Sequence, residues 1–293
     1  MRVERYTDQV GDAAQAYSTG ESELRRRDAR QGQPVRRWLA YDGDAVVGAA
    51  TTWLRPDGRL FLQFGALQLD SVRPLTREIS DELGCAVYAS VNGEDDLLAG
   101  LLHAGYRPEI VLERFEVPFE SVLDALSRAP SPRGFEILSA RDADLDRLFD
   151  LDNRLRRLVP GTDGWVGDIE WMRSELEEQP PFDPYAYLVA VAGTGEYAGL
   201  VRIWRNETGP RFGLVGVLPE FRRTLIGPDL IRRAVDAAST WGPEFFTTET
   251  ELGNRHIHRR LHKLGARSVG FTYQLVFEPN ASFGARVPGT PPI

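Results

Sequence analysis

The sequence has very little cysteine and no long apolar run. Cys85 is the only cysteine among 293 residues, which excludes an intramolecular disulfide, a thiolate metal cluster and a Cys-x-x-Cys redox pair. No segment approaches the ~20 consecutive apolar residues of a membrane-spanning helix, and residues 1–6 lack the apolar core of a secretory signal. These absences predict a soluble protein without membrane contact that stays in a reducing cytoplasm.

An excess of positive charge is also lacking. The chain has 35 basic and 43 acidic side chains and a formal net charge of -8, which argues against a protein dedicated to holding duplex nucleic acid by phosphate neutralisation. Lys263 is the only lysine, so nearly all the positive charge comes from arginine. A hydrophobic content of 42% is sufficient for buried cores. The length of 293 residues predicts two domains rather than one.

A proline- and serine-rich stretch near the middle of the chain separates two halves. We expect one domain over residues 1–126, a linker over 127–133, a second domain over 134–278 and a disordered tail over 279–293. Strand-like and helix-like segments alternate within each half. This alternation favours an α/β architecture built on a mixed sheet.

Hydrophobic patterning predicts a series of strands and helices in the second half. Ser139 and Asp142 resemble a capping box that starts a helix. Pro228 suits the first position of a second helix, and Asn254 suits the N-cap of a third that ends at Gly265. The expected strands lie at residues 135–138, 187–192, 197–204, 212–218, 245–252 and 269–277. The second and third of these are expected to form a hairpin.

A weaker copy of this pattern is present in the first half. Asn92 and Asn254 each open a helix that ends in glycine and runs on into a terminal strand, at residues 111–117 and 271–277. Further expected strands of the first half lie at residues 38–41, 45–54 and 60–64. The sequence therefore predicts an internal duplication.

Three segments of the second half resemble the GNAT superfamily, the N-acetyltransferases that use acyl-CoA. They are residues 137–145, residues 216–223 (Gly-Val-Leu-Pro-Glu-Phe-Arg-Arg) and residues 254–265. The duplicated layout is similar to that of tandem-domain members such as mycothiol synthase. The resemblance covers most of residues 134–278 and implies tandem GNAT-like domains. The N-terminal one is degenerate, because residues 67–74 contain no counterpart of the family's phosphate-binding loop.

The resemblance implies an acyl donor, acetyl-CoA or another acyl-CoA, that lies where two neighbouring strands part. In the family, a loop of the form Arg/Gln-x-x-Gly-x-Gly/Ala holds the pyrophosphate on backbone amides at a helix N-terminus. Here the loop is degenerate, because Leu225 replaces the first glycine and Pro228 has no backbone N–H to donate. The expected donor-binding residues are Val217, Leu218, Arg222, Arg223, Leu225, Ile226, Gly227 and Asn254.

The resemblance also implies a proton acceptor on the penultimate core strand and a tyrosine acid in the last helix. Glu249 and Glu251 alternate on that strand, so they share one face and are candidate general bases, with Glu249 the first choice. Two solvent-facing carboxylates are the open alternative. Leu261 stands where the family has the tyrosine, and Tyr273 or a bound water is the expected replacement. A strand amide within residues 214–218 is expected to stabilise the oxyanion.

The loop between the first two helices of the second half is expected to hold a cationic amine through charge and ring faces. Its candidate residues are Asp163, Trp165, Glu170 and Trp171. The two tryptophans suit a cover over the core equally well. His258 and His262 have the i, i+4 spacing of a metal pair. We expect no metal, because no acidic ligand lies nearby in the sequence and the flanking arginines repel a cation.

Three functions remain open on this sequence. The working hypothesis is an acyltransferase that moves an acyl group onto a primary amine of a small molecule, such as a secondary metabolite. The second is an aminoacyl-tRNA-dependent, amide-forming aminoacyltransferase on the same fold, and the third is a non-catalytic ligand-binding protein. The side chains expected to contact tRNA are Arg222, Arg223, Arg255, Arg259, Arg260 and Lys263, extended by Arg232 and Arg233. Monomer and homodimer are both open.

Overall fold

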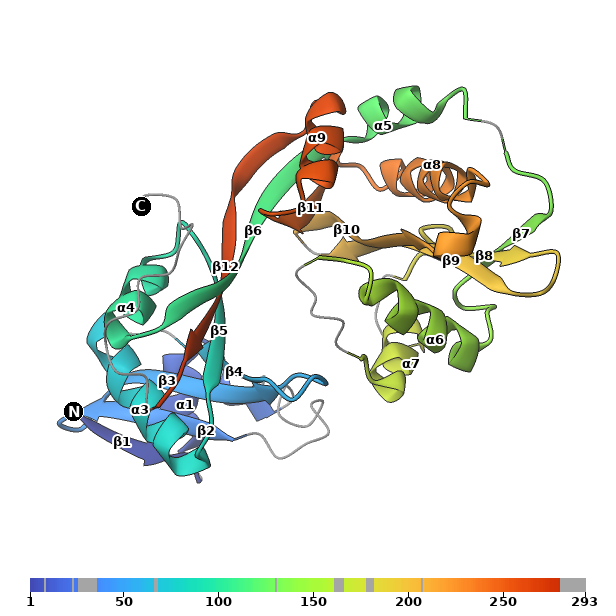
Figure 1. Ribbon diagram of the computed structural model, residues 1–293. Helices are drawn as coiled ribbons and strands as arrows, with labels where there is room; N and C mark the ends of the chain where they lie inside the picture. Colours follow the sequence, from blue (N-terminus) through green and yellow to red (C-terminus); the bar gives the residue numbers. More distant parts are fainter. Residues whose placement is uncertain are drawn as a thin grey trace. The chain divides into compact units, whose positions relative to one another are not determined.

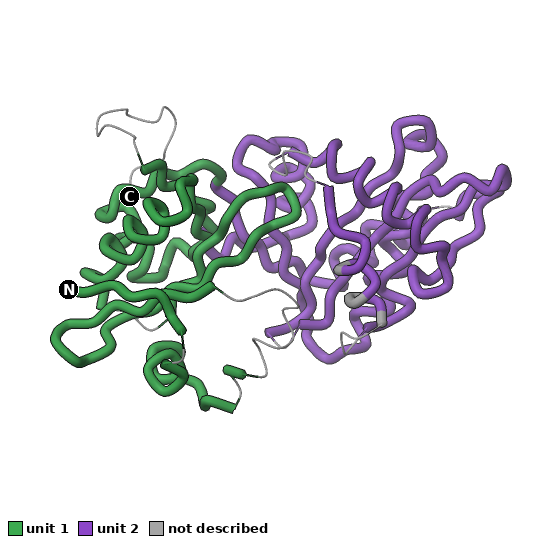
Figure 2. The backbone as a smooth tube through the Cα atoms, turned by 90° about the horizontal axis from the view of Figure 1, so that it is seen from below, with its two compact units in different colours: residues 1–110, 272–293 green, residues 111–271 purple. Residues whose placement is uncertain are grey.

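The computed structural model describes residues 1–7, 9–22, 24–25, 36–65, 68–129, 131–160, 166–177, 182–206 and 208–279. The chain forms two compact units, which are coloured separately in Figure 2. Unit 1 consists of residues 1–110 and 272–293, and unit 2 of residues 111–271. Apart from Pro279, the tail expected to be disordered lies outside the described residues. Among the helices described, none combines the length and the apolarity needed to cross a bilayer.

Unit 1 is a mixed sheet with helices on both faces. Helices α3 (Val72–Leu83) and α4 (Asp96–Ala104) follow the 3-10 turn η1 (Leu69–Ser71) and share one hydrophobic core with the sheet. Helix α1 (Val10–Ala16) packs on a second core. The strands, in hydrogen-bonded order, are β1 (Arg2–Arg5), β2 (Arg37–Asp42), β3 (Ala45–Leu54), β4 (Leu60–Phe64), β5 (Val87–Asn92) and the end of β12 (Arg267–Phe277).

Unit 2 is also a mixed sheet between two layers of helices (Figure 1). Helices α5 (Phe119–Leu126), α8 (Ile226–Ser239) and α9 (Arg255–Lys263) share a core on one face. Helices α6 (Leu145–Arg156) and α7 (Ile169–Glu177) share a core on the other face, which we call the α6–α7 face. The strands, in hydrogen-bonded order, are β7 (Phe135–Ser139), β8 (Tyr187–Ala192), β9 (Tyr197–Asn206), β10 (Gly209–Val217), β11 (Phe245–Glu251) and β6 (Arg107–Pro118).

The two halves of the sequence exchange their last strands. Strand β12 follows α9 in the chain but pairs antiparallel with β5 of unit 1. Strand β6 follows α4 in the chain but pairs antiparallel with β11 of unit 2. With this exchange, the strand orders of the two units correspond element by element, which confirms the internal duplication. The domain boundaries expected at residues 126 and 134 divide the chain into two consecutive segments. They therefore assign β6 and β12 each to its own half of the sequence and not to the sheet that it joins.

Side-chain caps decide where two helices of unit 2 begin. The helix expected from Ser139 begins only at Leu145, because Asp144 is its N-cap and accepts a hydrogen bond from the Arg147 amide at 3.0 Å. The capping-box assignment at Ser139 is therefore wrong, and this residue ends β7 instead. Asn254 is the N-cap of α9, as the sequence predicts, and its side-chain oxygen accepts a hydrogen bond at the first turn.

Two further helix starts differ from the sequence expectation by a few residues. Helix α8 begins at Ile226, so Pro228 occupies its third position rather than its first. Helix α4 begins at Asp96 with Asp95 as its N-cap, and Asn92 ends the preceding strand. In each case a residue other than the expected one is the N-cap. The amino-acid composition alone does not identify which of several nearby residues takes that position.

Candidate functional site

Strands β10 and β11 run parallel but part after a short contact. Within the described chain they pair at one position, Arg211 opposite Thr247. Strand β10 continues to Val217, paired with β9 throughout, and β11 continues to Glu251. Alternate backbone groups of a strand point to each side, so the second half of β10 presents peptide groups that β11 does not pair. We call this opening the β10–β11 notch, and it confirms the expected parting of two strands.

A β-bulge lies beside the β10–β11 notch. The register between β10 and β9 shifts between Phe212 and Leu214, which leaves Gly213 as the extra residue. A Cβ atom at Gly213 would lie 2.9 Å from Nε1 of Trp204. Real side chains do not approach that closely, so a glycine is needed here. A glycine inside a strand pattern is a known sign of a bulge, and the sequence therefore held a signal for this feature.

The two candidate bases lie along one edge of the β10–β11 notch. Phe246 is buried in the core under α8, so strand alternation turns Thr247, Glu249 and Glu251 to the α6–α7 face. The two carboxylates therefore share one face, as expected. Arg211 pairs with Thr247. Glu249 lies two residues after Thr247 and the bulge residue Gly213 lies two residues after Arg211, so Glu249 is level with the bulge.

Glu249 forms an ion pair with Arg211 across the β10–β11 notch. The side chain of Glu249 is 27% exposed and that of Arg211 is 42% exposed. On the other side of β11, Arg114 lies opposite Glu249 in the register with β6, and its guanidinium donates to the Val269 carbonyl at 3.4 Å. Glu249 thus has an ion-pair partner on β10 and an arginine opposite it in the register on β6. Arg211 is a site residue that the sequence analysis missed.

Glu251 ends β11 next to a histidine that the sequence analysis set aside. The Glu251 carbonyl lies 3.2 Å from Nε2 of His258, and Nδ1 of the same ring lies 3.3 Å from the Glu113 carboxylate on β6. Both ring nitrogens therefore face oxygen acceptors. The expectation that no acidic side chain lies near His258 is wrong, because β6 supplies one from the other half of the sequence. The described residues contain no group of three or more metal-ligating side chains.

In the loop after β10, Leu225 adopts a backbone conformation that is typical of glycine. This loop includes the 3-10 turn η2 (Pro219–Phe221) and ends at Leu225, the N-cap of α8. Leu225 has a φ of 63°, in the left-handed region, which glycine adopts without steric cost and leucine does not. Its side chain is 48% exposed. The chain therefore holds the strained conformation at the position where the resemblance expects glycine.

The same loop packs back onto the end of β10. A Cβ atom at Gly227 would lie 3.2 Å from the Val217 side chain, and Nε of Arg222 donates to the Val217 carbonyl at 3.5 Å. Ile226 and Gly227 open α8, and amides in the first turn of a helix have no acceptor within that helix. Pro228 follows them and has no amide. The structure thus brings Val217, Arg222, Ile226 and Gly227 together at the end of the β10–β11 notch.

Two expected site residues lie away from the β10–β11 notch. Leu218 is 1% exposed, and its amide donates to the Ala198 carbonyl at 2.9 Å. Tyr273 lies in the part of β12 that belongs to unit 1, opposite Val91, and packs against the core of that unit. The structure therefore does not bring Tyr273 together with the β11 carboxylates within one unit.

The expected acceptor residues are only partly described. Glu170 begins the first turn of α7, where its side chain is 75% exposed and pairs with Arg173 at 3.3 Å. Asp163 and Trp165 lie outside the described residues, and so does the side chain of Trp171. Helix α7 itself packs on the α6–α7 face, to which Glu249 also points.

Asp229 neutralises part of the basic surface expected along α8. Its buried carboxylate contacts the guanidinium groups of Arg232 and Arg233, each at 2.9 Å, and accepts from the Ser131 hydroxyl at 3.2 Å. Burial alone would raise the pKa of Asp229, but the hydrogen bonds from the two arginines outweigh it and hold the pKa below its ordinary value of 3.8. These arginines are therefore ion-paired, whereas Arg222, Arg223, Arg255, Arg259, Arg260 and Lys263 are exposed.

The Asp229→Asn variant tests this ion-paired cluster. Because the folded-state pKa lies below the unfolded one, the pairs contribute stability above about pH 4 and lose it as the pH falls through the folded-state pKa. We expect the variant to unfold about 1–2 kcal/mol more easily at pH 7 and to approach the parent protein at pH 3. Urea denaturation at both pH values measures this. The control is Asp236→Asn on the exposed side of α8, and an equal deficit at both pH values would contradict the assignment.

The strain at Leu225 makes a second prediction. A leucine in the left-handed region costs about 1 kcal/mol, and glycine removes that cost at the price of a more flexible unfolded chain. We expect Leu225→Gly to raise the free energy of unfolding by about 0.5 kcal/mol, measured by urea denaturation. Arg223→Gly, an equally exposed neighbour with ordinary φ, should lower it instead. A destabilised Leu225→Gly variant would show that no strain is stored there.

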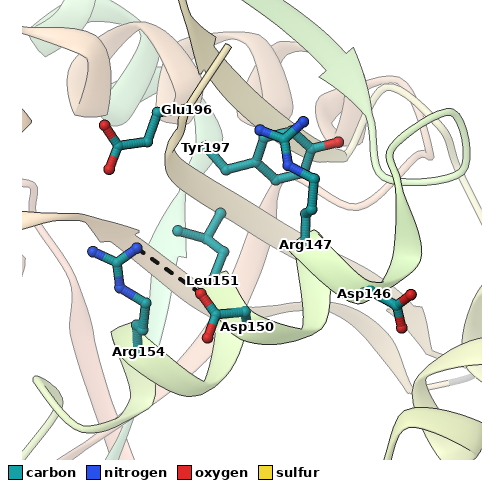
Figure 3. Close-up of a pocket in the computed structure, with 7 residues that line it drawn as sticks. All are labelled: Asp146, Arg147, Asp150, Leu151, Arg154, Glu196 and Tyr197. Atoms are coloured by element: carbon teal, nitrogen blue, oxygen red, sulfur yellow. Dashed lines mark ion pairs between the residues drawn. The ribbon is translucent and has the colours of Figure 1, made fainter. Parts of the chain in front are cut away.

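A separate pocket of about 290 Å³ lies on the outer surface of α6. Its lining comes from α6, the β8–β9 turn and the first residue of β9: Asp146, Arg147, Asp150, Leu151, Arg154, Glu196 and Tyr197 (Figure 3). Arg147 stacks on the Tyr197 ring, with 4.2 Å between the guanidinium carbon and the ring centre, and Arg154 pairs with Asp150 at 3.9 Å. Because these charged groups contact their own neighbours, we place the candidate site at the β10–β11 notch.

Comparison with known proteins gives one family match and several structural matches. Residues 146–266 match the family model described as the acetyltransferase (GNAT) family. No curated protein matches the chain. A GCN5-related N-acetyltransferase from Sphaerobacter thermophilus is 16% identical with a TM-score of 0.60, and the match covers 97% of this chain and 98% of that one. A tandem GNAT protein from the clavulanic acid biosynthesis pathway is 14% identical with a TM-score of 0.65, covering 96% and 100%.

The family match and the structural matches carry different information. The matched residues contain the β10–β11 notch, the loop before α8 and the whole of α9, so unit 2 carries an N-acyltransferase-like domain. The two solved structures have low identity and show the fold alone, over nearly the whole chain. Residues 146–266 match the acetyltransferase (GNAT) family, within a chain that has the mixed α/β fold of tandem GNAT proteins.

Proposed function

We propose that unit 2 transfers an acyl group, with acetyl-CoA as the default donor, onto a primary amine of a small molecule. The observation that carries the proposal is the β10–β11 notch. Peptide groups of β10 that β11 leaves unpaired need hydrogen-bond partners, and an extended ligand with amide groups supplies them in the way an added strand does. The pantetheine arm of CoA is such a ligand.

The loop at the end of β10 supports a donor with phosphate groups. The amides of Ile226 and Gly227 lie at the N-terminus of α8, where the helix dipole favours an anion. The exposed side chains of Arg222 and Arg223 add two positive charges. The left-handed backbone at Leu225 keeps the turn that a glycine would make. These features would hold the pyrophosphate of an acyl-CoA.

Glu249 is the group we assign to the amine. It is level with the bulge, at the deep end of the β10–β11 notch, where the acyl group of a donor held by the loop would lie. An ammonium gives one proton to the Glu249 carboxylate, and the neutral nitrogen attacks the thioester carbonyl carbon. The carbon–sulfur bond then breaks, the amide forms and the CoA thiolate takes up a proton. A β10 amide before Leu218 would stabilise the oxyanion.

The exposed cations of α9 support a second donor class, an aminoacyl-tRNA. Four of them lie on one short helix, Arg255, Arg259, Arg260 and Lys263, and a cluster of this kind attracts phosphates. The observation is weaker than the β10–β11 notch, because exposed charged residues also serve only to solvate a helix face. We therefore treat tRNA binding as an outcome of the same experiment.

Calorimetric titration with acetyl-CoA, alongside a gel shift with aminoacylated and bare tRNA at two salt concentrations, tests the donor. We expect acetyl-CoA to bind in the micromolar range, and Arg222→Ala to weaken this binding about tenfold through the lost phosphate contact. Salt-sensitive tRNA binding without CoA binding would replace the donor by aminoacyl-tRNA. Absence of both would make the protein a non-catalytic ligand-binding protein.

A further inference from the structure

The ion pair of Arg211 with Glu249 occupies the point where β10 and β11 separate. Arg211 is opposite Thr247 at the one described pairing position, and Glu249 follows two residues later on the same face. The guanidinium therefore reaches past the last paired residue to the carboxylate. Trp204 of β9 lies beside Arg211 on the same face. A cation and an anion thus meet at the deep end of the β10–β11 notch, where the amine has to arrive.

Little free energy is needed to separate this ion pair. Both side chains are partly exposed, at 42% and 27%, and exposed pairs contribute only about 0–1 kcal/mol. A molecule that offers one positive and one negative group gives each partner a replacement. Its carboxylate takes the two parallel N–H donors of Arg211, a geometry that arginine fits well, and its ammonium takes Glu249. When such a ligand replaces the ion pair, Arg211 and Glu249 each still have an opposite charge beside them.

We propose that Arg211 and Glu249 bind an acceptor that carries a carboxylate beside its amine, that is, an amine of the amino-acid type. The inference rests on the proposed function, since it assigns the acceptor of the same site. In an α-amino acid one carbon separates the two charged groups, so both fit into an opened arginine–glutamate pair. Arg211 holds the carboxylate, and the ammonium loses its proton to Glu249 before it attacks the thioester carbon.

The position of Arg114 is consistent with this division of roles. Arg114 lies opposite Glu249 on β6 and donates to a backbone carbonyl. The Arg114 guanidinium therefore already has a backbone partner on β12, whereas the Arg211 guanidinium contacts Glu249 itself. Glu251, two residues further, lies at the open end of β11 beside Gly253. The structure thus gives the carboxylate-binding role to Arg211 rather than to the other charged groups along β11 and β6.

Binding measurements test the assignment separately from turnover. The probes are L-amino acids, each titrated beside the amine that lacks its carboxylate, with and without acetyl-CoA. We expect the parent protein to bind its preferred amino acid at least about tenfold more tightly than the matched amine. Arg211→Gln should weaken amino-acid binding about 10- to 100-fold and change binding of the matched amine less than about threefold. The control is Arg205→Gln on β9, an exposed arginine stacked on Trp241.

Each outcome decides the proposal. Equal affinity of the parent protein for the two probes, or unchanged discrimination in Arg211→Gln, overturns it. If succinyl-CoA binding, rather than amino-acid binding, depends on Arg211, the carboxylate belongs to the donor and the acceptor assignment is wrong. Acetyl-CoA binding reports on the proposed function independently. If the protein acetylates simple amines and shows no preference for amines that carry a carboxylate, the proposed function stands and the acceptor assignment is wrong.

Discussion

Asp152→Asn is expected to lower the free energy of unfolding by about 3–5 kcal/mol. The Asp152 side chain in α6 is 1% exposed. One of its oxygens contacts Arg156 one turn later, and the other lies 3.3 Å from Nη1 of Arg202 on β9. The two arginine side chains are only 10% and 7% exposed. Asparagine keeps the shape but removes the charge that both buried guanidiniums contact, so desolvation of those cations is no longer offset.

Asp150→Asn is the matched control for this experiment. Asp150 lies on the same helix, is 69% exposed and pairs with Arg154 at 3.9 Å. Exposed pairs of this kind contribute little, so the control should unfold within about 0.5 kcal/mol of the parent. Urea denaturation measures both variants. A deficit for Asp152→Asn within about 1 kcal/mol of the control would show that the buried cluster does not tie α6 to the sheet.

Local rules predict the elements of unit 2 better than their ends. The apolar pattern places the β8–β9 hairpin correctly, because both strands are largely apolar and buried on both faces and the intervening turn is short. Helix starts depend on which of several nearby polar residues caps the chain. Ser139 and Asp144 are both good caps by composition, and only the end of β7 at Ser139 decides between them.

The strand exchange lies beyond the reach of a local pattern. The sequence predicts strands at residues 111–117 and 269–277, but which sheet edge each one joins depends on contacts with residues far along the chain. The same limitation affects the site. Glu113 and Arg114 come from the first half of the sequence and reach His258 and Glu249 only because β6 pairs with β11. Sequence spacing could not place them there.

The candidate bases were easier to identify than their partners. Strand period fixes that Glu249 and Glu251 share a face, and family resemblance marks the loop around Leu225. The ion pair of Arg211 with Glu249 depends on how far β10 and β11 stay paired. Residue spacing along the chain does not measure how far the two strands stay paired.

Glu249→Gln is expected to lower kcat at least about 100-fold, since a positioned general base contributes roughly 10²- to 10⁴-fold. Glutamine fills the same volume, and its amide oxygen still accepts from Arg211, but it takes no proton from an ammonium. The KM for acetyl-CoA should change less than about threefold, because the donor is held by β10 and the loop before α8. Steady-state rates over a range of pH measure the effect, and thermal melting confirms that the variant is folded.

Glu251→Gln, on the same strand and face, separates proton transfer from a general loss of negative charge. Glu251 lies level with the outer half of the β10–β11 notch, two residues from the bulge, so its removal should cost less than about tenfold in kcat. The fall in kcat/KM should therefore be much larger in Glu249→Gln than in Glu251→Gln, because only the proton acceptor takes part in proton transfer. The reverse result would assign the base to Glu251. It would also separate Arg211 from proton transfer, since Arg211 contacts Glu249.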